Sequence, residues 1–224
     1  MAERFEVSLD GEKRITAVHY PAKTRDTATL ILAHGAGANQ FHTFMVRAAT
    51  GFAERGIETI TFNFLYTEEK RRPPDPLPRL EACFRAVVEK TRTRSPGARI
   101  FLGGKSMGGR VASHLAATGE RDLAGLVFLG YPLHPPGKPE QLRNRHLPQI
   151  SVPMLFVHGT RDPFGTPEEL RAIAATLRPK VTVFGVGDGD HSFKVLKRSG
   201  QSEDSVWDAV LAAVEAFVRA NSNY

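Results

Sequence analysis

Short apolar segments rich in β-branched residues alternate along this chain with longer segments whose apolar residues recur every three or four positions. This alternation is typical of a parallel β-sheet with crossover helices, because strands covered on both faces are apolar throughout. It predicts an α/β fold with a mostly parallel sheet of about eight strands and helices on both faces. The expected strands are 5–9, 15–20, 29–33, 58–62, 100–102, 125–129, 154–157 and 181–184, and the expected helices are 44–55, 80–91, 107–117, 168–177 and 206–219.

The remaining segments are predicted to be turns and loops. The first two strands flank Asp10-Gly11, which favours an antiparallel hairpin. Residues 72–79 and 132–148 are rich in proline and are expected to be loops, each too short for a separate domain. We therefore expect residues 1–224 to form a single domain without a large cap.

A formal net charge of +6 and an isoelectric point near 9.7 raise the question of nucleic-acid binding. The arginines, however, occur in short, separated clusters, as at 71–72, 92–94 and 143–145, and no nucleic-acid-binding motif accompanies them. We expect a solvated basic surface and no nucleic-acid partner.

The N-terminal residues 1–14 mix charged and apolar side chains and lack the apolar stretch of a signal peptide. No apolar run approaches the roughly 20 residues that span a bilayer. These patterns predict a soluble, cytoplasmic protein with no membrane partner. Cys83 lies on the apolar face of an expected helix and is predicted to be a core residue rather than a catalytic thiol.

The segment from Arg99 to Arg110 carries the strongest chemical signal. An apolar strand enters Gly104-Lys105-Ser106-Met107-Gly108, which fits G-x-S-x-G, and a helical pattern follows. In such a nucleophile elbow, small flanking residues let the backbone turn sharply and expose the serine above the sheet. Ser106 is therefore the predicted nucleophile.

Gly104-Lys105-Ser106 also resembles the end of a phosphate-binding loop, G-x-x-x-x-G-K-[ST]. The first glycine of that motif would fall at Arg99, and an apolar strand occupies the positions between. The nucleotide-binding interpretation is therefore rejected.

Two main-chain amides are expected to bind the negatively charged oxygen of a tetrahedral intermediate. Met107 follows the nucleophile at the start of a helix and is the expected first donor. The second should come from His34-Gly35-Ala36-Gly37, with Ala36 preferred and Gly37 as the alternative, because the motif does not fix the register. His34 is expected to brace this loop.

A serine hydroxyl needs a base to remove its proton and an acid to orient that base. Asp162 follows the strand 154–157, and His191 follows the strand 181–184, so both should reach the edge of the sheet where Ser106 lies. Asp188 and Asp190 are alternative acids, although Asp190 adjoins His191 and neighbouring side chains seldom face each other.

Other polar residues are expected to line the pocket or to support the structure rather than to react. Tyr131 and His134 follow the strand 125–129 and either line the pocket or belong to a surface loop. Lys105 and Arg110 flank the elbow and either favour an anionic substrate, face solvent or brace the turn. Four further histidines are expected to be structural: His19, His42, His114 and His146.

With these motifs in place, the chain resembles the α/β-hydrolase superfamily, and within it the small, lidless branch around dienelactone hydrolase. The likeness covers nearly the whole chain and is carried by residues 34–38, 103–110, 158–164 and 189–193. It implies an α/β-hydrolase fold and the chain order nucleophile, acid, base that Ser106, Asp162 and His191 follow. Dienelactone hydrolase itself uses a cysteine nucleophile, so the resemblance does not carry over its substrate.

The resemblance further implies hydrolysis of a small carboxylic ester or related acyl compound through an acyl-enzyme on Ser106, without metal or organic cofactor. The expected partner is a small-molecule acyl substrate, because the connection over 132–153 is too short for a cap. Thioester or peptide hydrolysis on the same residues remains open, as does a catalytically idle fold that works as a binding module.

Overall fold

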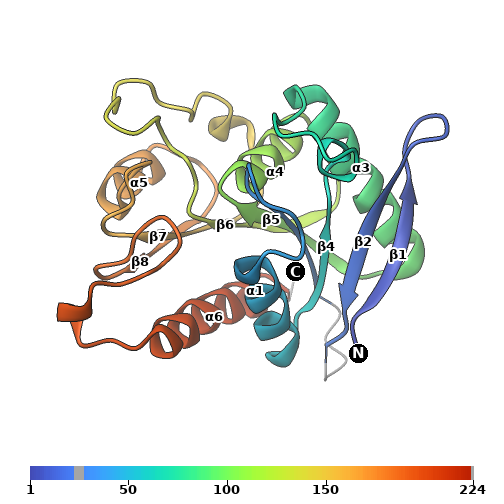
Figure 1. Ribbon diagram of the computed structural model, residues 1–224. Coiled ribbons are helices and arrows are strands. Elements are labelled where there is room, and N and C mark those ends of the chain that lie inside the picture. The colour runs from blue at the N-terminus through green and yellow to red at the C-terminus, as the bar shows by residue number, and fades with distance from the viewer. Residues whose placement is uncertain (23–27, 223–224) are drawn as a thin grey trace.

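The computed structural model describes residues 1–22 and 28–222. Its centre is one eight-stranded sheet of order β1-β2-β4-β3-β5-β6-β7-β8 (Figure 1). The strands β3 to β8 run parallel, whereas the β1–β2 hairpin and the β2–β4 pair are antiparallel. The strands are β1 (Glu3–Ser8), β2 (Arg14–Tyr20), β3 (Ala28–Ala33), β4 (Glu58–Phe62), β5 (Arg99–Lys105), β6 (Leu123–Leu129), β7 (Met154–Gly159) and β8 (Val181–Val186).

Helices cover both faces of the sheet. The helices α1 and α6 pack on one face, and α3, α4 and α5 pack on the other (Figure 1). The helices are α1 (Thr43–Glu54), α2 (Leu65–Glu68), α3 (Leu77–Arg94), α4 (Met107–Ala117), α5 (Pro167–Ala174) and α6 (Glu203–Ala220), with short 3₁₀ turns η1 (Leu147–Gln149) and η2 (Lys197–Ser199).

The two faces of β3 explain why its sequence is apolar without alternation. Leu30 and Leu32 contact the core beneath α1 and α6, whereas Ile31 and Ala33 contact the core beneath α3 and α4. Successive side chains of a strand point to opposite faces, so a strand covered on both sides must be apolar at every position. The sheet therefore holds the carboxyl ends of its central strands between two packed layers.

The α/β-hydrolase fold predicted above is confirmed, with no cap among the described residues. Two details differ from the predicted elements. The four-residue helix α2 was not expected, because a segment of one turn has no periodic pattern. Helix α3 begins at Leu77, inside the expected proline-rich loop, because Pro78 occupies the first turn, where no intrahelical N–H bond is lost.

Cys83 is fully buried against the α3 side of the core, as predicted. The helices within residues 1–22 and 28–222 include none with both the length and the apolar composition that crossing a membrane requires.

Candidate active site

Ser106 lies in the sharp turn between β5 and α4. Its backbone angles, φ 51° and ψ −114°, fall in a region that non-glycine residues rarely occupy, and its amide donates to Leu129 O at 3.1 Å. Strained backbone of this kind persists only where the surrounding packing holds it, and it is concentrated at functional sites. The residue predicted as the nucleophile therefore has the backbone geometry of an elbow.

Glycines on both sides of Ser106 permit this turn. A Cβ on Gly104 would lie 2.4 Å from Gly108 C, and a Cβ on Gly108 would lie 2.3 Å from Ala33 O. Neither separation is possible for real atoms, so the first turn of α4 can approach β3 and β5 only with glycine at both positions. Gly35 also borders the elbow, since a Cβ there would lie 3.3 Å from Lys105 O and 3.5 Å from Cβ of Ser106. The loop after β3 is thus pressed against the elbow.

The predicted first oxyanion donor, Met107, directly follows Ser106, and the predicted alternatives for the second, Ala36 and Gly37, follow Gly35. Met107 is the first residue of α4, so its amide has no carbonyl partner within the helix. Ala36 and Gly37 form an exposed turn closed by a hydrogen bond from Ala38 N to Gly35 O, with Gly37 at φ 73°. The predicted donors thus lie at the first residue of α4 and in the turn that follows Gly35, the residue that borders Ser106.

The predicted acid and base are in direct contact. Nδ1 of His191 lies 2.7 Å from Oδ2 of Asp162, within hydrogen-bonding distance. Asp162 is buried, and the His191 side chain is 22% exposed. With Nδ1 directed to the carboxylate, Nε2 is the ring nitrogen left for proton transfer.

The loops that carry the acid and the base are packed together at Gly159. A Cβ there would lie 2.3 Å from Gly189 O, so only glycine allows this approach. Arg161 N donates to Gly189 O at 2.9 Å, and the rings of Phe164 and His191 are 4.5 Å apart between centroids. These contacts fix the separation of Asp162 and His191 through the main chain.

The Asp162 carboxylate is kept ionised by its neighbours. Burial alone would raise its pKa, but the hydrogen bond with His191, the nearby His158 ring and the amide of Phe164 outweigh burial and lower the pKa. Oδ1 accepts that amide at 2.9 Å, while Oδ2 faces His191. An ionised carboxylate can stabilise an imidazolium as it forms.

The alternative acids do not contact His191. The Asp190 carboxylate accepts the amides of Ser192 and Lys194 at 2.7 and 3.0 Å, so it closes its own loop. Asp188 is bonded through its main-chain amide to Thr160 Oγ1 at 2.9 Å. Among the three carboxylates weighed from the sequence, the one that binds the His191 ring is Asp162.

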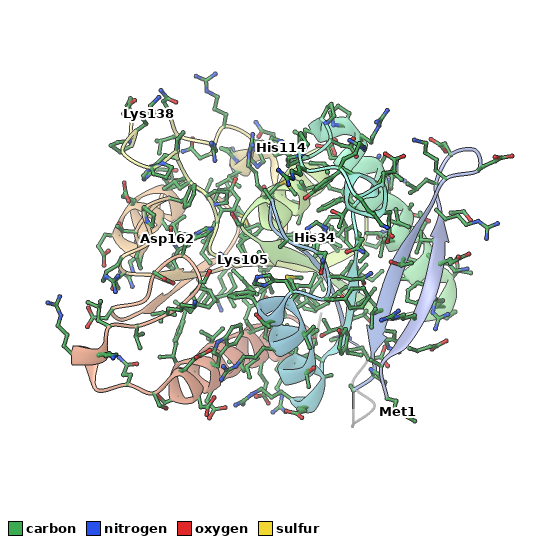
Figure 2. All side chains as sticks on the ribbon, viewed as in Figure 1. Met1, His34, Lys105, His114, Lys138 and Asp162 are labelled. Carbon is green, nitrogen blue, oxygen red and sulfur yellow. The ribbon has the colours of Figure 1, made fainter. Side chains whose placement is uncertain are left out.

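The elbow and the His191 loop meet through the residue that precedes Ser106. Lys105 Nζ lies against the main-chain carbonyl of His191. Among the described residues, no side-chain hydrogen bond joins the Ser106 hydroxyl to His191. Such bonds are often long in enzymes without substrate and tighten only when it binds. Lys105 is the last residue of β5, and His34 and Asp162 follow β3 and β7; the three lie across the middle of the molecule (Figure 2).

His34 braces the loop after β3, as expected. Its ring is fully buried, with Nδ1 2.8 Å from Gly35 O and Nε2 3.3 Å from the amide of Phe64. Burial lowers its pKa to about 4, so the ring is neutral at pH 7, and its nitrogens bond to the loop after β3 and to the segment after β4. It is therefore unsuited to act as the base.

The other histidines also have partners within the fold. His42 caps α1 by accepting the amide of Phe44, and His19 lies 3.6 Å from Glu58. The rings of His114 and His146 stack with centroids 3.6 Å apart, and burial lowers their pKa values to about 4 and about 3. These contacts agree with a structural role for all four.

Tyr131 and His134 do not form a surface loop. Tyr131 is fully buried, and its hydroxyl donates to Arg143 O at 2.9 Å. His134 is 6% exposed and lies 3.3 Å from Glu169. Prolines around them indicated a loop, but the side chains turn inward and anchor the β6–β7 connection.

Two residues near the acid and base had no assigned partner in the sequence. His158, fully buried at the end of β7, places Nε2 2.8 Å from Tyr131 O and Nδ1 3.5 Å from Asp162. Lys105 is buried as well. The sequence feature that could have identified both is a polar residue at or next to the end of an apolar strand. Burying such a residue is costly unless it has a partner.

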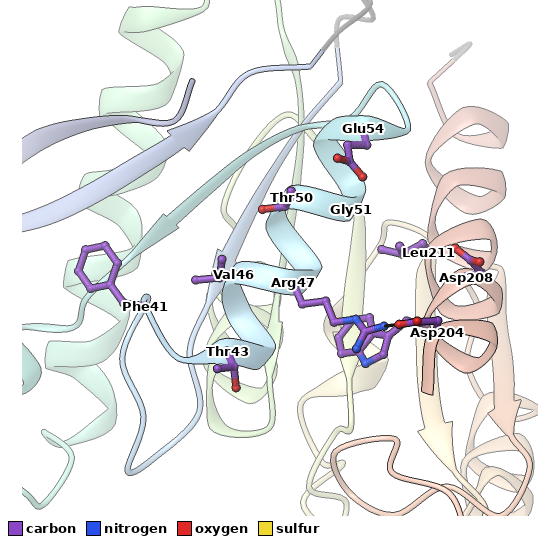
Figure 3. A pocket seen from close by; sticks show the side chains of 11 residues that line it. Phe41, Thr43, Val46, Arg47, Thr50, Gly51, Glu54, Asp204, Asp208 and Leu211 are labelled. Carbon is purple, nitrogen blue, oxygen red and sulfur yellow. Dashed lines mark hydrogen bonds and ion pairs between the residues drawn. The ribbon is translucent and has the colours of Figure 1, made fainter. Parts of the chain in front are cut away.

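A wide surface groove lies away from these residues, between α1 and α6 (Figure 3). Arg47 of α1 pairs there with Asp204 of α6, beside Trp207 and Leu211. No serine, cysteine or histidine lines the groove. It therefore lacks a serine or cysteine paired with a histidine, and none of the predicted site residues lines it.

Comparisons with known proteins agree with this geometry. A model of the alpha/beta hydrolase domain matches residues 26–219. The fold is similar to a dienelactone hydrolase from Anabaena variabilis, with a TM-score of 0.77, 18% identity, and coverage of 96% of this chain and 95% of that one. It is also similar to an α/β serine hydrolase without a lid from Xanthomonas campestris, with a TM-score of 0.70, 19% identity, and coverage of 98% and 93%.

A third similar structure is an α/β serine hydrolase homologue from Coxiella burnetii, with a TM-score of 0.72, 17% identity, and coverage of 98% of this chain and 96% of that one. At these identities the structural likeness establishes the fold alone. The family model, by contrast, matches most of the sequence, residues 26–219. The chain belongs to the alpha/beta hydrolase family.

Proposed function

We propose that this protein is a serine hydrolase that cleaves small carboxylic esters or related acyl compounds, with Ser106 as nucleophile, His191 as base and Asp162 as the orienting acid. The observation that carries the proposal is the hydrogen bond of 2.7 Å between His191 and Asp162 beside a serine held at φ 51°. An imidazole oriented by a carboxylate and a serine at a strained turn are two of the features by which a hydroxyl nucleophile is activated, and they support the proposal.

In the first half-reaction, Ser106 Oγ attacks the acyl carbon while His191 Nε2 takes the hydroxyl proton. The carbonyl oxygen becomes negatively charged and is bound by the amides of Met107 and Ala36, with Gly37 as the alternative donor. When the tetrahedral intermediate collapses, the bond to the leaving alkoxide breaks. The proton held on His191 passes to that oxygen, which leaves an acyl-enzyme and a free alcohol.

In the second half-reaction, water attacks the acyl-enzyme while His191 accepts one of its protons. Collapse of the new intermediate breaks the bond to Ser106 Oγ, returns the proton to that oxygen and releases the carboxylic acid. Asp162 remains ionised throughout and stabilises the imidazolium in each half.

The proposed substrate is a small acyl compound. The β6–β7 connection, residues 130–153, contains only the 3₁₀ turn Leu147–Gln149 as regular structure, and no cap stands over the elbow among the described residues. An open site of this kind supports access of short acyl groups. One of the proteins of similar fold is a dienelactone hydrolase.

Labelling with a fluorophosphonate probe tests the proposal. We expect wild-type protein to be labelled covalently and Ser106→Ala to remain unlabelled, because only an activated serine attacks the phosphorus. A folded wild-type protein that is not labelled would indicate a binding module instead. Hydrolysis of p-nitrophenyl esters of increasing chain length, beside matched thioester and amide substrates, then defines the acyl group and bond that are cleaved.

A further inference from the structure

Lys105, the residue before the proposed nucleophile, has its side chain inside the protein. It is 8% exposed and lies at the carboxyl end of β5. Taking an ammonium group out of water is costly unless the protein supplies partners for it. A buried lysine beside a nucleophile therefore needs an explanation.

The hydrogen-bond partner of Lys105 belongs to the loop that carries the proposed base, and an aromatic ring of α1 lies nearby. Nζ donates to the main-chain carbonyl of His191 at 2.5 Å and lies 5.3 Å from the centroid of the Phe44 ring. Lys105 and Ser106 are consecutive, so this hydrogen bond ties the main chain of the base directly to that of the nucleophile.

Gly130, which follows β6, leaves the space that this contact occupies. Its φ is 67°, and a Cβ there would lie 2.8 Å from Lys105 Nζ, 3.0 Å from His191 O and 3.3 Å from His191 Cε1. The elbow, the end of β6 and the His191 loop therefore meet at a single point, where a side chain on residue 130 would separate them.

The charges around Lys105 do not form a simple ion pair. Burial lowers its pKa to about 8, and the carboxylates of Asp162 and Asp190 act in the opposite direction. Among the described residues, no carboxylate oxygen lies within 4.0 Å of Nζ, and Asp162 pairs instead with His158 and His191. Burying the Lys105 ammonium with only a main-chain carbonyl as its hydrogen-bond partner should not stabilise the fold. Its burial therefore indicates a role other than stability.

We propose that Lys105 is a positioning residue, which fixes the main chain of His191 relative to Ser106 so that the imidazole is held in reach of the hydroxyl. This inference rests on the proposed function. It does not assign Lys105 a contact with substrate, because its ammonium faces the His191 carbonyl.

The substitution Lys105→Met tests this role, because methionine has a similar length but neither charge nor donor. We expect kcat for a p-nitrophenyl ester to fall about 10- to 100-fold with KM changed less than about threefold, as for a displaced catalytic group. The urea midpoint of unfolding should stay equal or rise, because an apolar side chain replaces a buried charge.

A merely structural role predicts the opposite combination, in which activity falls only as far as the folded fraction falls. That result, or a Lys105→Met variant labelled by the fluorophosphonate probe at the wild-type rate, would overturn the inference. Lys194→Met is the matched control, since Lys194 is an exposed lysine of the same loop and should leave kcat unchanged.

Two further results complete the test. If Lys105→Met does not fold, Lys105→Arg decides, because arginine keeps a charged donor: a labelling rate within about threefold of wild type supports the role, and a loss of about tenfold or more contradicts it. Wild-type protein that is never labelled refutes the proposed function itself, whereas a labelled wild type with an equally labelled Lys105→Met refutes this inference alone.

Discussion

The two oxygens of the Asp162 carboxylate have different partners. Oδ1 accepts the amide of Phe164, and Oδ2 faces the ring of His191. The main-chain bond prevents the carboxylate from rotating, so the imidazole has one fixed acceptor. Orientation of the base is thus determined at the level of single atoms.

Asp162→Asn should therefore abolish most activity while leaving the fold intact. An amide keeps the size of the carboxylate but cannot hold an imidazolium and favours the wrong tautomer, so we expect kcat/KM for an ester to fall about 10⁴-fold. Steady-state kinetics with far-ultraviolet circular dichroism checks this. Asp188→Asn is the control, and equal losses in the two variants would mean that Asp162 is not the orienting acid.

Sequence order was sufficient to select Ser106, Asp162 and His191, because each follows a different parallel strand and parallel strands end at one edge. The direction of the Lys105 side chain was not predictable. Whether that side chain faces solvent or His191 depends on Gly130 and Phe44, and periodicity within one segment carries no information about such contacts between distant segments.

At the scale of the elements, α4 packs closely against β3 beside the site. This packing depends on Gly104 and Gly108, whose hydrogen atoms face main-chain atoms. The strands and longer helices were predictable because their patterns extend over several residues. Helix α2 was not predicted, because tertiary packing determines a helix of one turn. The start of α3 was predicted at Leu80 instead of Leu77, because its first turn tolerates a proline.

Gly108→Ala tests this packing. The added Cβ would lie 2.3 Å from Ala33 O, so α4 or β3 must shift, and we expect the free energy of unfolding to fall by about 1–3 kcal/mol. Urea unfolding measures the difference. Gly187→Ala is the control, since a Cβ there would lie 3.9 Å from its nearest neighbour, and an equal effect of both substitutions would show that α4 packing is not responsible.

At the scale of the whole molecule, three histidines link stability to pH. Burial lowers the pKa of His34 and His114 to about 4 and that of His146 to about 3, from 6.5. The unfolded chain therefore binds protons more readily than the folded one below pH 6.5. By linkage, the stability of the fold must decrease as the pH falls through this window.

Between pH 6.5 and 5 we expect the free energy of unfolding to fall by about 1–3 kcal/mol, since each neutral imidazole costs at most about 1.4 kcal/mol per pH unit and partial exposure reduces that value. Urea unfolding at several pH values checks this. A free energy of unfolding that is equal at pH 6.5 and pH 5 would mean that these rings are protonated in the folded state.

The strand order places the proposed nucleophile and the proposed base on strands that differ in how they are held in the sheet. Ser106 follows β5, which has a hydrogen-bonded neighbour on each side, whereas His191 follows β8, which pairs within the sheet only with β7 among the described residues. An edge strand, which is hydrogen-bonded on one side, unfolds locally more easily than a central strand that is hydrogen-bonded on both. Local unfolding of β8 would displace His191 while Ser106, its turn and most of the core stay native. Activity should then be lost at a lower temperature or denaturant concentration than the global fold.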